Sequence, residues 1–393
     1  MLEGDTQRVN GGRPVGLRLL ALLATRTLGE VFNRYVSLYA GGTLPVDHST
    51  SPGISVVVPS WNGRPLLQKF LPSVVESVAA FQAATSLPAE IVIADDHSND
   101  DSARWLGEHY PSIRFETASS RRGFSPTVNR GVRAAKYSWV FVLNNDVALE
   151  PNTLCPLIAH FSDPSVFGVV GQVYDAATGI LIGGGQYGEF RRGFLGVHKR
   201  YFVSEREPPT GVAYLTFWGN GCSTIYDREK FLAIGGFEEL FAPYGWEDVE
   251  IGIKAWKQGF PTIYEPRSAI WHARSATIGS RFSRQRVRAV YERNRLWAHW
   301  MHLDTAEQFM KHAGVLLLKL GFDPLVLRWD TWSSFLQAMR EVPHIGTRRK
   351  ELLAQRRLLL TEVFERIDQQ ANRPEVRAYS DETAPVRPCP HRY

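Results

Sequence analysis

The chain has 393 residues, of which 44% are hydrophobic and 22% charged, and its formal net charge is +5. This composition excludes a disordered protein, and the length allows one large α/β domain with additional segments. The three cysteines, Cys155, Cys222 and Cys389, lie far apart, which excludes a disulfide framework or a cysteine zinc site and favours a reducing compartment.

The first 50 residues are expected to form a helical extension and a linker. Residues 1–13 carry acidic side chains and no continuous apolar stretch, so a secretory signal is a poor interpretation. Leucines alternate with arginines over residues 15–39 and predict an amphipathic helix, which would pack on the main domain or lie on a membrane. Residues 41–53 have the Gly, Pro, Ser and Thr content of a linker. No apolar run reaches the ~18 residues needed to span a bilayer.

Strands and helices alternate between residues 54 and 146. Apolar runs rich in β-branched residues predict strands over residues 54–58, 91–94, 113–117 and 139–143. Helical spacing predicts two short helices over residues 66–71 and 72–81, the second opened by Pro72, and then a helix ending near residue 109 and one over residues 126–135. This alternation indicates βαβ units and therefore a mostly parallel sheet.

The pattern changes beyond residue 146. It predicts helices over residues 152–161, 227–235 and 246–258, and strands over residues 166–170, 213–217, 222–225, 262–265 and 270–272. Residues 171–211 are glycine-rich and predict hairpins or loops. They include Gly183-Gly184-Gly185-Gln186-Tyr187-Gly188, which matches G-x-G-x-x-G, but no helix opening follows. A dinucleotide site is therefore rejected.

The chain after residue 281 is predicted to be helical, mainly over residues 315–320, 332–339 and 350–367. Counted from residue 281 onward, the chain carries 20 Lys and Arg against 13 Asp and Glu. Such an excess fits a solvated helix face, an anionic membrane surface or an anionic substrate. The sequence has no zinc-finger spacing, helix-turn-helix pattern or RNA-binding aromatic motif, so no nucleic-acid partner is expected.

The predicted strand over residues 139–143 is apolar at every position and ends in Asn144-Asn145-Asp146. Such a strand fits the centre of a sheet covered on both faces. In open α/β sheets ligands bind outside the carboxyl ends of the strands, where Asp146 would lie. A turn leading to a helix that begins at Pro151 is the alternative interpretation.

Five motifs occur in order over residues 54–276. They are Val57-Val58-Pro59-Ser60-Trp61-Asn62, Asp95-Asp96-His97-Ser98-Asn99-Asp100, Arg122-Gly123-Phe124 with Asn129-Arg130-Gly131, Asn144-Asn145-Asp146 and Trp246-Glu247-Asp248. Together they resemble the motifs of the inverting GT-A glycosyltransferases of family 2, and among these the bacterial rhamnosyltransferases.

The resemblance implies an α/β GT-A fold, Rossmann-like, with a mostly parallel sheet flanked by helices. We expect this domain over residues 51–280, with helical extensions over residues 1–50 and 281–393, the latter basic. The resemblance also implies a nucleotide-diphosphate-sugar donor, a divalent metal (Mg²⁺ or Mn²⁺) and a single displacement at the anomeric carbon.

The metal ligands implied by the resemblance are Asp146 and His272. A hard cation held by carboxylates and the diphosphate would stabilise the charge that develops on the leaving group. The family motif is Asp-x-Asp, and here its first position is Asn144, which removes one negative charge. His272 follows a predicted strand, and a structural role is its alternative.

The donor site implied by the resemblance comes from the first four motifs. Its residues are Pro59, Trp61, Asn62, Asp95, Asp96, Arg122, Gly123, Asn129, Asn144 and Asn145. Pro59, Trp61 and Asn62 would lie against the base and ribose of the nucleotide. Asp95 or Asp96 would accept hydrogen bonds from the base or ribose. Helix capping is the alternative for the Asp pair, and a solvated position is the alternative for Arg121 and Arg122.

Inversion requires a base that deprotonates the acceptor hydroxyl. By motif position Asp248 is the expected base and Glu247 its neighbour contacting the acceptor, because a carboxylate at a helix start stays ionised. Stabilisation of the first helical turn is the alternative role for both. Trp218 and Trp246 would form the aromatic floor under an acceptor sugar, or belong to the core.

The sequence therefore predicts an inverting glycosyltransferase that acts on a glycan or lipid-linked acceptor. A nucleotidyltransferase would need a glycine-rich basic phosphate loop after the first strand, which residues 59–63 do not supply. A noncatalytic nucleotide-sugar or glycan-binding module is the other alternative; Asn144 favours it and the Glu247-Asp248 pair argues against it. We expect a cytoplasmic protein, with peripheral contact at the inner face of the membrane left open.

Overall fold

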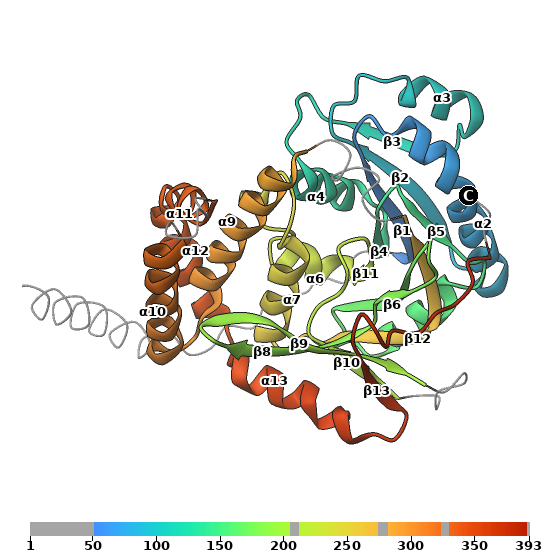
Figure 1. The fold of residues 1–393 in the computed structure, drawn as a ribbon. Helices are drawn as coiled ribbons and strands as arrows, with labels where there is room; N and C mark the ends of the chain where they lie inside the picture. Colours follow the sequence, from blue (N-terminus) through green and yellow to red (C-terminus); the bar gives the residue numbers. More distant parts are fainter. Residues whose placement is uncertain (1–50, 205–211, 274–281, 324–329, 391–393) are drawn as a thin grey trace, which may run out of the picture.

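The computed structural model describes residues 51–204, 212–273, 282–323 and 330–390 (Figure 1). The predicted helix over residues 15–39 lies outside these ranges. The centre is a ten-stranded sheet in the order β10-β12-β6-β11-β4-β1-β2-β3, to which β5 adds beside β12 and β7 beside β6. Its strands are β1 (Ser51–Ser60), β2 (Ala89–Asp95), β3 (Arg114–Thr117), β4 (Tyr137–Leu143), β5 (Val147–Leu149), β6 (Gly168–Asp175), β7 (Leu181–Gly183), β10 (Tyr214–Thr216), β11 (Ser223–Asp227) and β12 (Thr262–His272).

The strands predicted up to residue 146 form the parallel half of this sheet. β1 pairs in parallel with β2 and with β4, and β2 pairs in parallel with β3. β11 then runs antiparallel to both β4 and β6, while β6 pairs in parallel with β12. The α/β class and the mostly parallel sheet are thus confirmed, and the carboxyl ends of β1, β2, β4 and β12 meet at one edge.

Helices cover both faces of the sheet (Figure 1). One face carries α2 (Arg64–Thr85), α3 (Ser102–His109) and α5 (Leu154–Ala159), and the other carries α4 (Phe124–Ala134), α6 (Arg228–Ala233) and α7 (Glu247–Lys257). Successive strand residues point to opposite faces, so Val56 packs under α2 while Val57 packs under α4. Each apolar layer is nearly inaccessible to solvent and holds the strand ends in place.

The two short helices predicted over residues 66–71 and 72–81 are a single helix, α2, with Pro72 inside it. The prediction was wrong because the apolar face continues through the proline: Phe70, Leu71 and Val74 are all buried against the sheet. Burial of this face outweighs the loss of the one backbone hydrogen bond that proline cannot donate.

The helix predicted over residues 350–367 is two helices, α12 (Val342–Gln355) and α13 (Leu360–Asp368). The chain turns between them because the backbone N–H groups of Arg357 and Leu358 both donate to the carbonyl of Lys257, at 2.6 and 3.0 Å. The break therefore attaches the C-terminal region to the end of α7.

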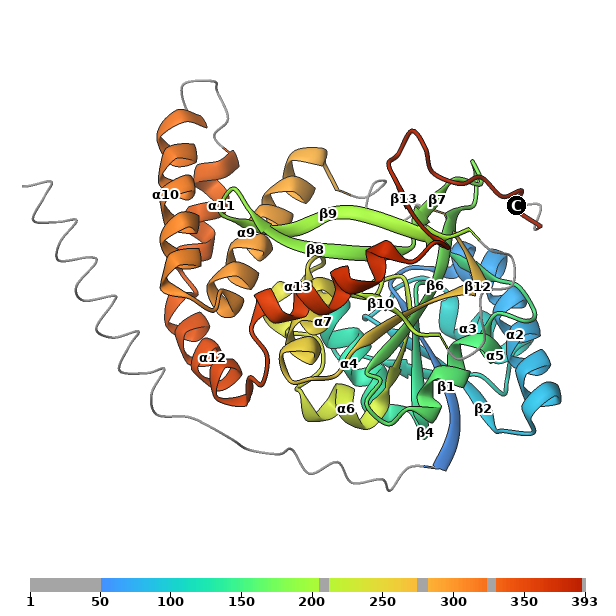
Figure 2. The ribbon, with the colours of Figure 1, turned by 90° about the horizontal axis from the view of Figure 1, so that it is seen from below.

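The glycine-rich residues 171–211 include a long hairpin, as predicted. β8 (Gly185–Arg191) and β9 (Phe194–Val203) pair antiparallel, and β13 (Val376–Tyr379) adds to β9 in a second sheet. This hairpin reaches from the central sheet to the C-terminal helices (Figure 2). Gly183 to Gly188 lie in β7 and β8, with no helix after them, which agrees with the rejection of a dinucleotide motif.

The C-terminal region packs on the core through α9 (Arg284–His302), α10 (Ala306–Phe322) and α11 (Asp330–Met339) together with α12 and α13. A buried ion pair and a buried hydrogen bond join it to α7: Lys257 lies 2.7 Å from Asp304, and Nε2 of His302 lies 3.0 Å from Oε1 of Glu250. In the described ranges, no helix combines the length and apolar content that a bilayer crossing requires.

Candidate active site

A cleft of about 500 Å³ opens at the edge where the parallel strands end. β1 delivers Pro59, Ser60 and Trp61 to it, and β4 delivers the segment from Asn144 to Asp146. The N-terminus of α7 closes the opposite side with Glu247 and Asp248. Of the predicted site residues, those lining the cleft are Pro59, Trp61, Asp96, Gly123, Asn144, Asn145, Asp146, Trp246, Glu247, Asp248 and His272.

Strand pairing brings Asp146 and His272 together. β5 begins directly after Asp146 and pairs antiparallel with the end of β12, where Val147 faces His272. The backbone N–H of Ala273 donates to the carbonyl of Asp146 at 2.9 Å, which fixes this arrangement. As a result, Oδ1 of Asp146 lies 3.2 Å from Nε2 of His272.

The donor atoms at this point fit a divalent cation. Oδ1 of Asp146 and Oδ1 of Asn144 are both buried and accept no hydrogen bond of normal geometry. Burial lowers the pKa of His272, but the adjacent Cys222 and Asp146 outweigh it and raise that pKa to about 10, so without a cation the ring is protonated and pairs with Asp146. A cation bound here would take the place of that proton. No three His, Cys, Asp or Glu residues of the described chain gather into a complete metal site. Protein side chains would therefore supply only part of a coordination sphere.

The loop before α4 is held against the cleft by Asp96. Its carboxylate accepts from the backbone N–H groups of Arg122, at 2.8 Å, and Gly123, at 2.9 Å. Gly123 has φ +96°, and a Cβ there would lie 2.8 Å from Cα of Pro243, so only glycine allows this approach. The guanidinium of Arg121 lies 3.3 Å from the centroid of the Trp61 ring and forms the cationic wall of the cleft.

The two acidic residues at the start of α7 have different surroundings. Asp248 accepts from the backbone N–H groups of Gly221 and Val249, both at 2.9 Å. Glu247 is 7% exposed, and its Oε2 has no hydrogen-bond partner. The preceding Trp246 adopts φ +75°, a strained conformation for a bulky residue, which turns the chain abruptly into the helix.

These different surroundings affect the pKa values of the two carboxyl groups differently. Burial raises the pKa of Glu247 to about 8, and the charge of Asp248 adds to that rise. Burial also raises the pKa of Asp248, but its two backbone hydrogen bonds oppose the effect. The two backbone hydrogen bonds therefore favour the ionised form of Asp248 relative to that of Glu247, which has no such donors at its Oε2.

An aromatic wall on the α7 side of the cleft includes residues that the sequence did not single out. Tyr291 on α9 packs over Gly245, where an added Cβ would lie 3.0 Å from its ring, and Phe282 lies 5.5 Å from Tyr244 between ring centroids. These side chains line the cleft together with Trp246. Their positions depend on how α9 packs, so no local sequence signal identified them.

Four predicted site residues lie beside the cleft but do not line it. Asp95 accepts hydrogen bonds from Ser98 and from Thr117, and thereby closes the turn after β2. Asn62 stabilises the same turn, because its Oδ1 accepts a hydrogen bond from the backbone N–H of Asn99 at 2.8 Å. The other two are Arg122, which donates to Glu239, and Trp218, which packs on Phe217 and Gly252.

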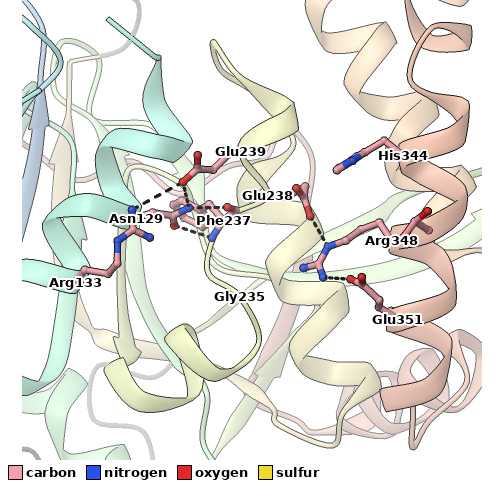
Figure 3. A pocket seen from close by; sticks show the side chains of 10 residues that line it. Asn129, Arg133, Gly235, Phe237, Glu238, Glu239, His344, Arg348 and Glu351 are labelled. Atoms are coloured by element: carbon pink, nitrogen blue, oxygen red, sulfur yellow. Dashed lines mark hydrogen bonds and ion pairs between the residues drawn. The ribbon is translucent and has the colours of Figure 1, made fainter. Parts of the chain in front are cut away.

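Asn129 lines a second, smaller pocket of about 280 Å³, between α4 and α12 (Figure 3). Its side chain is 3% exposed, and it exchanges two hydrogen bonds with the backbone of Phe237, at 2.8 and 2.9 Å. Asn129 thus holds the backbone of Phe237 outside the cleft, and a donor contact for it stays a prediction. The charged groups of this pocket are also paired, with Arg348 bonded to Glu238 and Glu351 (Figure 3).

Comparison with known proteins agrees with this geometry. Residues 55–218 match the model of glycosyl transferase family 2, and residues 200–273 match a model described as the N-terminal domain of galactosyltransferase. An N-acetylglucosaminyl-diphospho-decaprenol L-rhamnosyltransferase of Mycobacterium tuberculosis is 25% identical over 58% of this chain and 78% of its own length. The O-antigen chain rhamnosyltransferase WbaN of Salmonella anatum is 23% identical over 63% of this chain and 74% of its own.

The fold also resembles a solved glycosyltransferase. The crystal structure of GalNAc-T7 with UDP, GalNAc and Mn²⁺ superposes with a TM-score of 0.54 at 14% identity, and the match covers 93% of this chain and 68% of that one. The fold is thus of the GT-A class. The chain is a glycosyltransferase with a glycosyl transferase family 2 domain.

Proposed function

We propose that the chain is an inverting glycosyltransferase that moves a sugar from a nucleotide-diphosphate-sugar to a hydroxyl group of a lipid-linked glycan. The observation that carries this proposal is that one cleft holds the Asp146–His272 pair at the strand ends and the carboxyl group of Asp248 at the start of α7. The names of the relatives from M. tuberculosis and S. anatum make rhamnose the first donor sugar to test and a polyprenyl diphosphate glycan the first acceptor.

Asp146 and His272 would hold a divalent cation, Mg²⁺ or Mn²⁺, with Asn144 as a neutral third oxygen. Such a cation, when bound, stabilises the negative charge that develops on the diphosphate. Because Asn144 is neutral, the protein contributes one carboxylate here, and affinity for the cation depends strongly on the donor's own phosphates. The positive wall made by Arg121 faces the same space and would assist in holding the donor.

Asp248 would take the proton of the acceptor hydroxyl. As the C–O bond to the diphosphate breaks, the acceptor oxygen forms the new bond to the anomeric carbon from the opposite face, and the diphosphate leaves with the bonding electron pair. The two backbone hydrogen bonds to Asp248 fix its orientation and favour its ionised form. Glu247, protonated near neutral pH, would donate a hydrogen bond to the acceptor.

A panel of nucleotide-diphosphate sugars, with rhamnose donors included, tests the proposal. Nucleotide release and transfer to an acceptor would be measured with Mg²⁺, with Mn²⁺ and with excess chelator. We expect one donor to be turned over, with inversion at the anomeric carbon, and we expect chelation to stop the reaction reversibly. Full activity in chelator would contradict the metal assignment. Donor binding without transfer to any acceptor would favour the noncatalytic binding module that Asn144 leaves open.

A further inference from the structure

The exposed apolar side chains of this protein gather on one part of the surface. Ten large hydrophobic side chains are exposed in the described residues, and eight of them belong to the helices α10 and α11 and the start of α12. They are Met310, Leu317, Leu318, Phe322, Trp332, Leu336, Met339 and Val342. These helices form the edge of the molecule opposite α2, as both views show (Figures 1 and 2). We call this surface the apolar helical face. Its apolar residues form a group, whereas exposed apolar residues on a soluble protein are normally scattered singly.

The periodicity of α10 shows that the exposed face is a continuous stripe. Positions 310, 314, 317, 318, 321 and 322 are exposed, whereas Gln308, His312, Leu316 and Leu320 are buried toward the protein. From residue 314 to residue 322 the exposed positions are Gly, Leu, Leu, Gly and Phe, with no charge among them. Leu317 is 69% exposed and Leu318 is 73% exposed. A helix in water normally places polar residues on such a face.

Three basic side chains lie at the margins of this face. Lys311 and Arg340 are exposed near its two ends and Lys319 is half-buried at its side, while the exposed acid Glu307 is paired with Lys311 at 2.5 Å. The sequence from residue 281 onward has seven more basic than acidic side chains. An apolar stripe with basic margins is complementary to a bilayer that contains anionic lipids, where apolar groups enter the acyl region and basic groups meet the headgroups.

Trp332 has the polarity expected at such a boundary. Its indole N–H donates to the carbonyl of Leu320 at 2.8 Å, which joins α11 to the end of α10, while 37% of the residue remains exposed. Tryptophan is enriched at the level of lipid headgroups, because one end of the side chain is apolar and the other polar.

We propose that the face formed by α10, α11 and the start of α12 docks on an anionic membrane surface. This inference rests on the proposed function in one respect, since a lipid-linked acceptor gives the docking its purpose. Helix α9 connects this face with the cleft. The indole N–H of Trp297 on α9 donates to the carbonyl of Ala338 on α11 at 3.1 Å, and Tyr291, also on α9, lines the cleft. Docking would therefore fix the position of α9, and with it of the acceptor side of the cleft, relative to the bilayer.

The test is sedimentation of the full chain with vesicles of phosphatidylcholine, with and without phosphatidylglycerol. We expect the wild type to bind the anionic vesicles, more weakly as salt is raised. The double variant Leu317→Glu/Leu318→Glu should bind at least about tenfold more weakly, because two charges must enter the interface. Val386→Glu is the matched control: Val386 is 68% exposed but pairs with Ile180 away from these helices, so this variant should bind like the wild type.

Three results would overturn the inference. The first is that the wild type does not bind anionic vesicles. The second is that the double variant binds them as well as the wild type does. The third is that the wild type is a dimer and the double variant a monomer, while neither protein binds vesicles. The last result, seen by light scattering, would assign the face to a second copy of the chain. Donor turnover in the same samples separates the two proposals. Vesicle binding without any sugar transfer would refute the function and leave the docking surface standing.

Discussion

Asn294, in the middle of α9, donates from its side-chain amide to the carbonyl oxygen of Gly245, two residues before Glu247, at 2.8 Å. The same amide nitrogen lies 2.8 Å from the carbonyl of Phe241 and 3.0 Å from that of Tyr244. One fully buried side chain of the C-terminal region thus holds the loop that leads into α7. The C-terminal region is in this sense part of the candidate active site.

Asn294→Ala should lower the turnover rate more than the donor affinity. The substitution leaves three carbonyl groups without their donor and frees the loop that orients Glu247 and Asp248, at a cost of about 1–3 kcal/mol in stability. Asn129→Ala is the matched control, because Asn129 is an equally buried clamp that lies outside the cleft. Both variants should be less stable to urea. If the folded Asn129→Ala protein lost as much turnover as Asn294→Ala, Asn294 would have no specific positioning role.

The two adjacent arginines before α4 should differ in their effect on donor binding. Arg121 lines the cleft and stacks on Trp61, whereas Arg122 points to Glu239 at 2.8 Å. Arg121→Met keeps much of the side-chain volume but removes the charge, so donor affinity should fall by roughly tenfold. Arg122→Met should change it by less than about twofold, since its ion pair is exposed. Calorimetric titration with the donor compares them, and equal losses would contradict the assignment.

A pH-dependent stability should follow from Glu247. Its folded pKa of about 8 lies above the ordinary value of 4.5, so between these values the folded protein keeps a proton that the unfolded chain has lost. The free energy of unfolding gained from this proton is complete below pH 4.5 and is lost as the pH rises through 8. Urea unfolding at pH 5.5 and 8.5 should therefore show a decline that is smaller in Glu247→Gln by at least about 1 kcal/mol. An unchanged decline in that variant would place the proton on another group.

The sequence predicted those parts of the fold that depend on short-range patterns. The apolar runs marked β1, β2 and β4 because central strands must be apolar on both faces. The polar residues directly after β4 likewise marked the sheet edge that opens into the cleft. Such features are local, and the chain displays them without reference to its tertiary contacts.

Tertiary packing decided the rest. Nothing near Asn294 or Tyr291 distinguishes these residues from others on a helix, and their roles depend on how α9 meets a loop some fifty residues earlier in the chain. The choice between Arg121 and Arg122 depends on backbone direction, which Asp96 sets by binding the N–H groups of Arg122 and Gly123. Motif position alone predicted that Asn129 contacts the nucleotide-sugar donor, but its side-chain amide forms hydrogen bonds with the backbone of Phe237.

The central claim is the division of roles between Asp146, beside His272, and Asp248, at the start of α7. Asp248→Asn preserves shape and can still accept from the N–H of Gly221, but it cannot take a proton. Asp146→Ala instead removes the only carboxylate of the proposed cation site. The two variants should therefore fail in different ways.

The most direct measurement is a donor titration beside single-turnover transfer for the wild type and both variants. Asp248→Asn should bind the donor like the wild type and transfer the sugar about 10²–10⁴-fold more slowly, as expected for loss of a general base. Asp146→Ala should lose both donor affinity and transfer. Wild-type transfer by Asp248→Asn would contradict the account and make Glu247 the next candidate for the base.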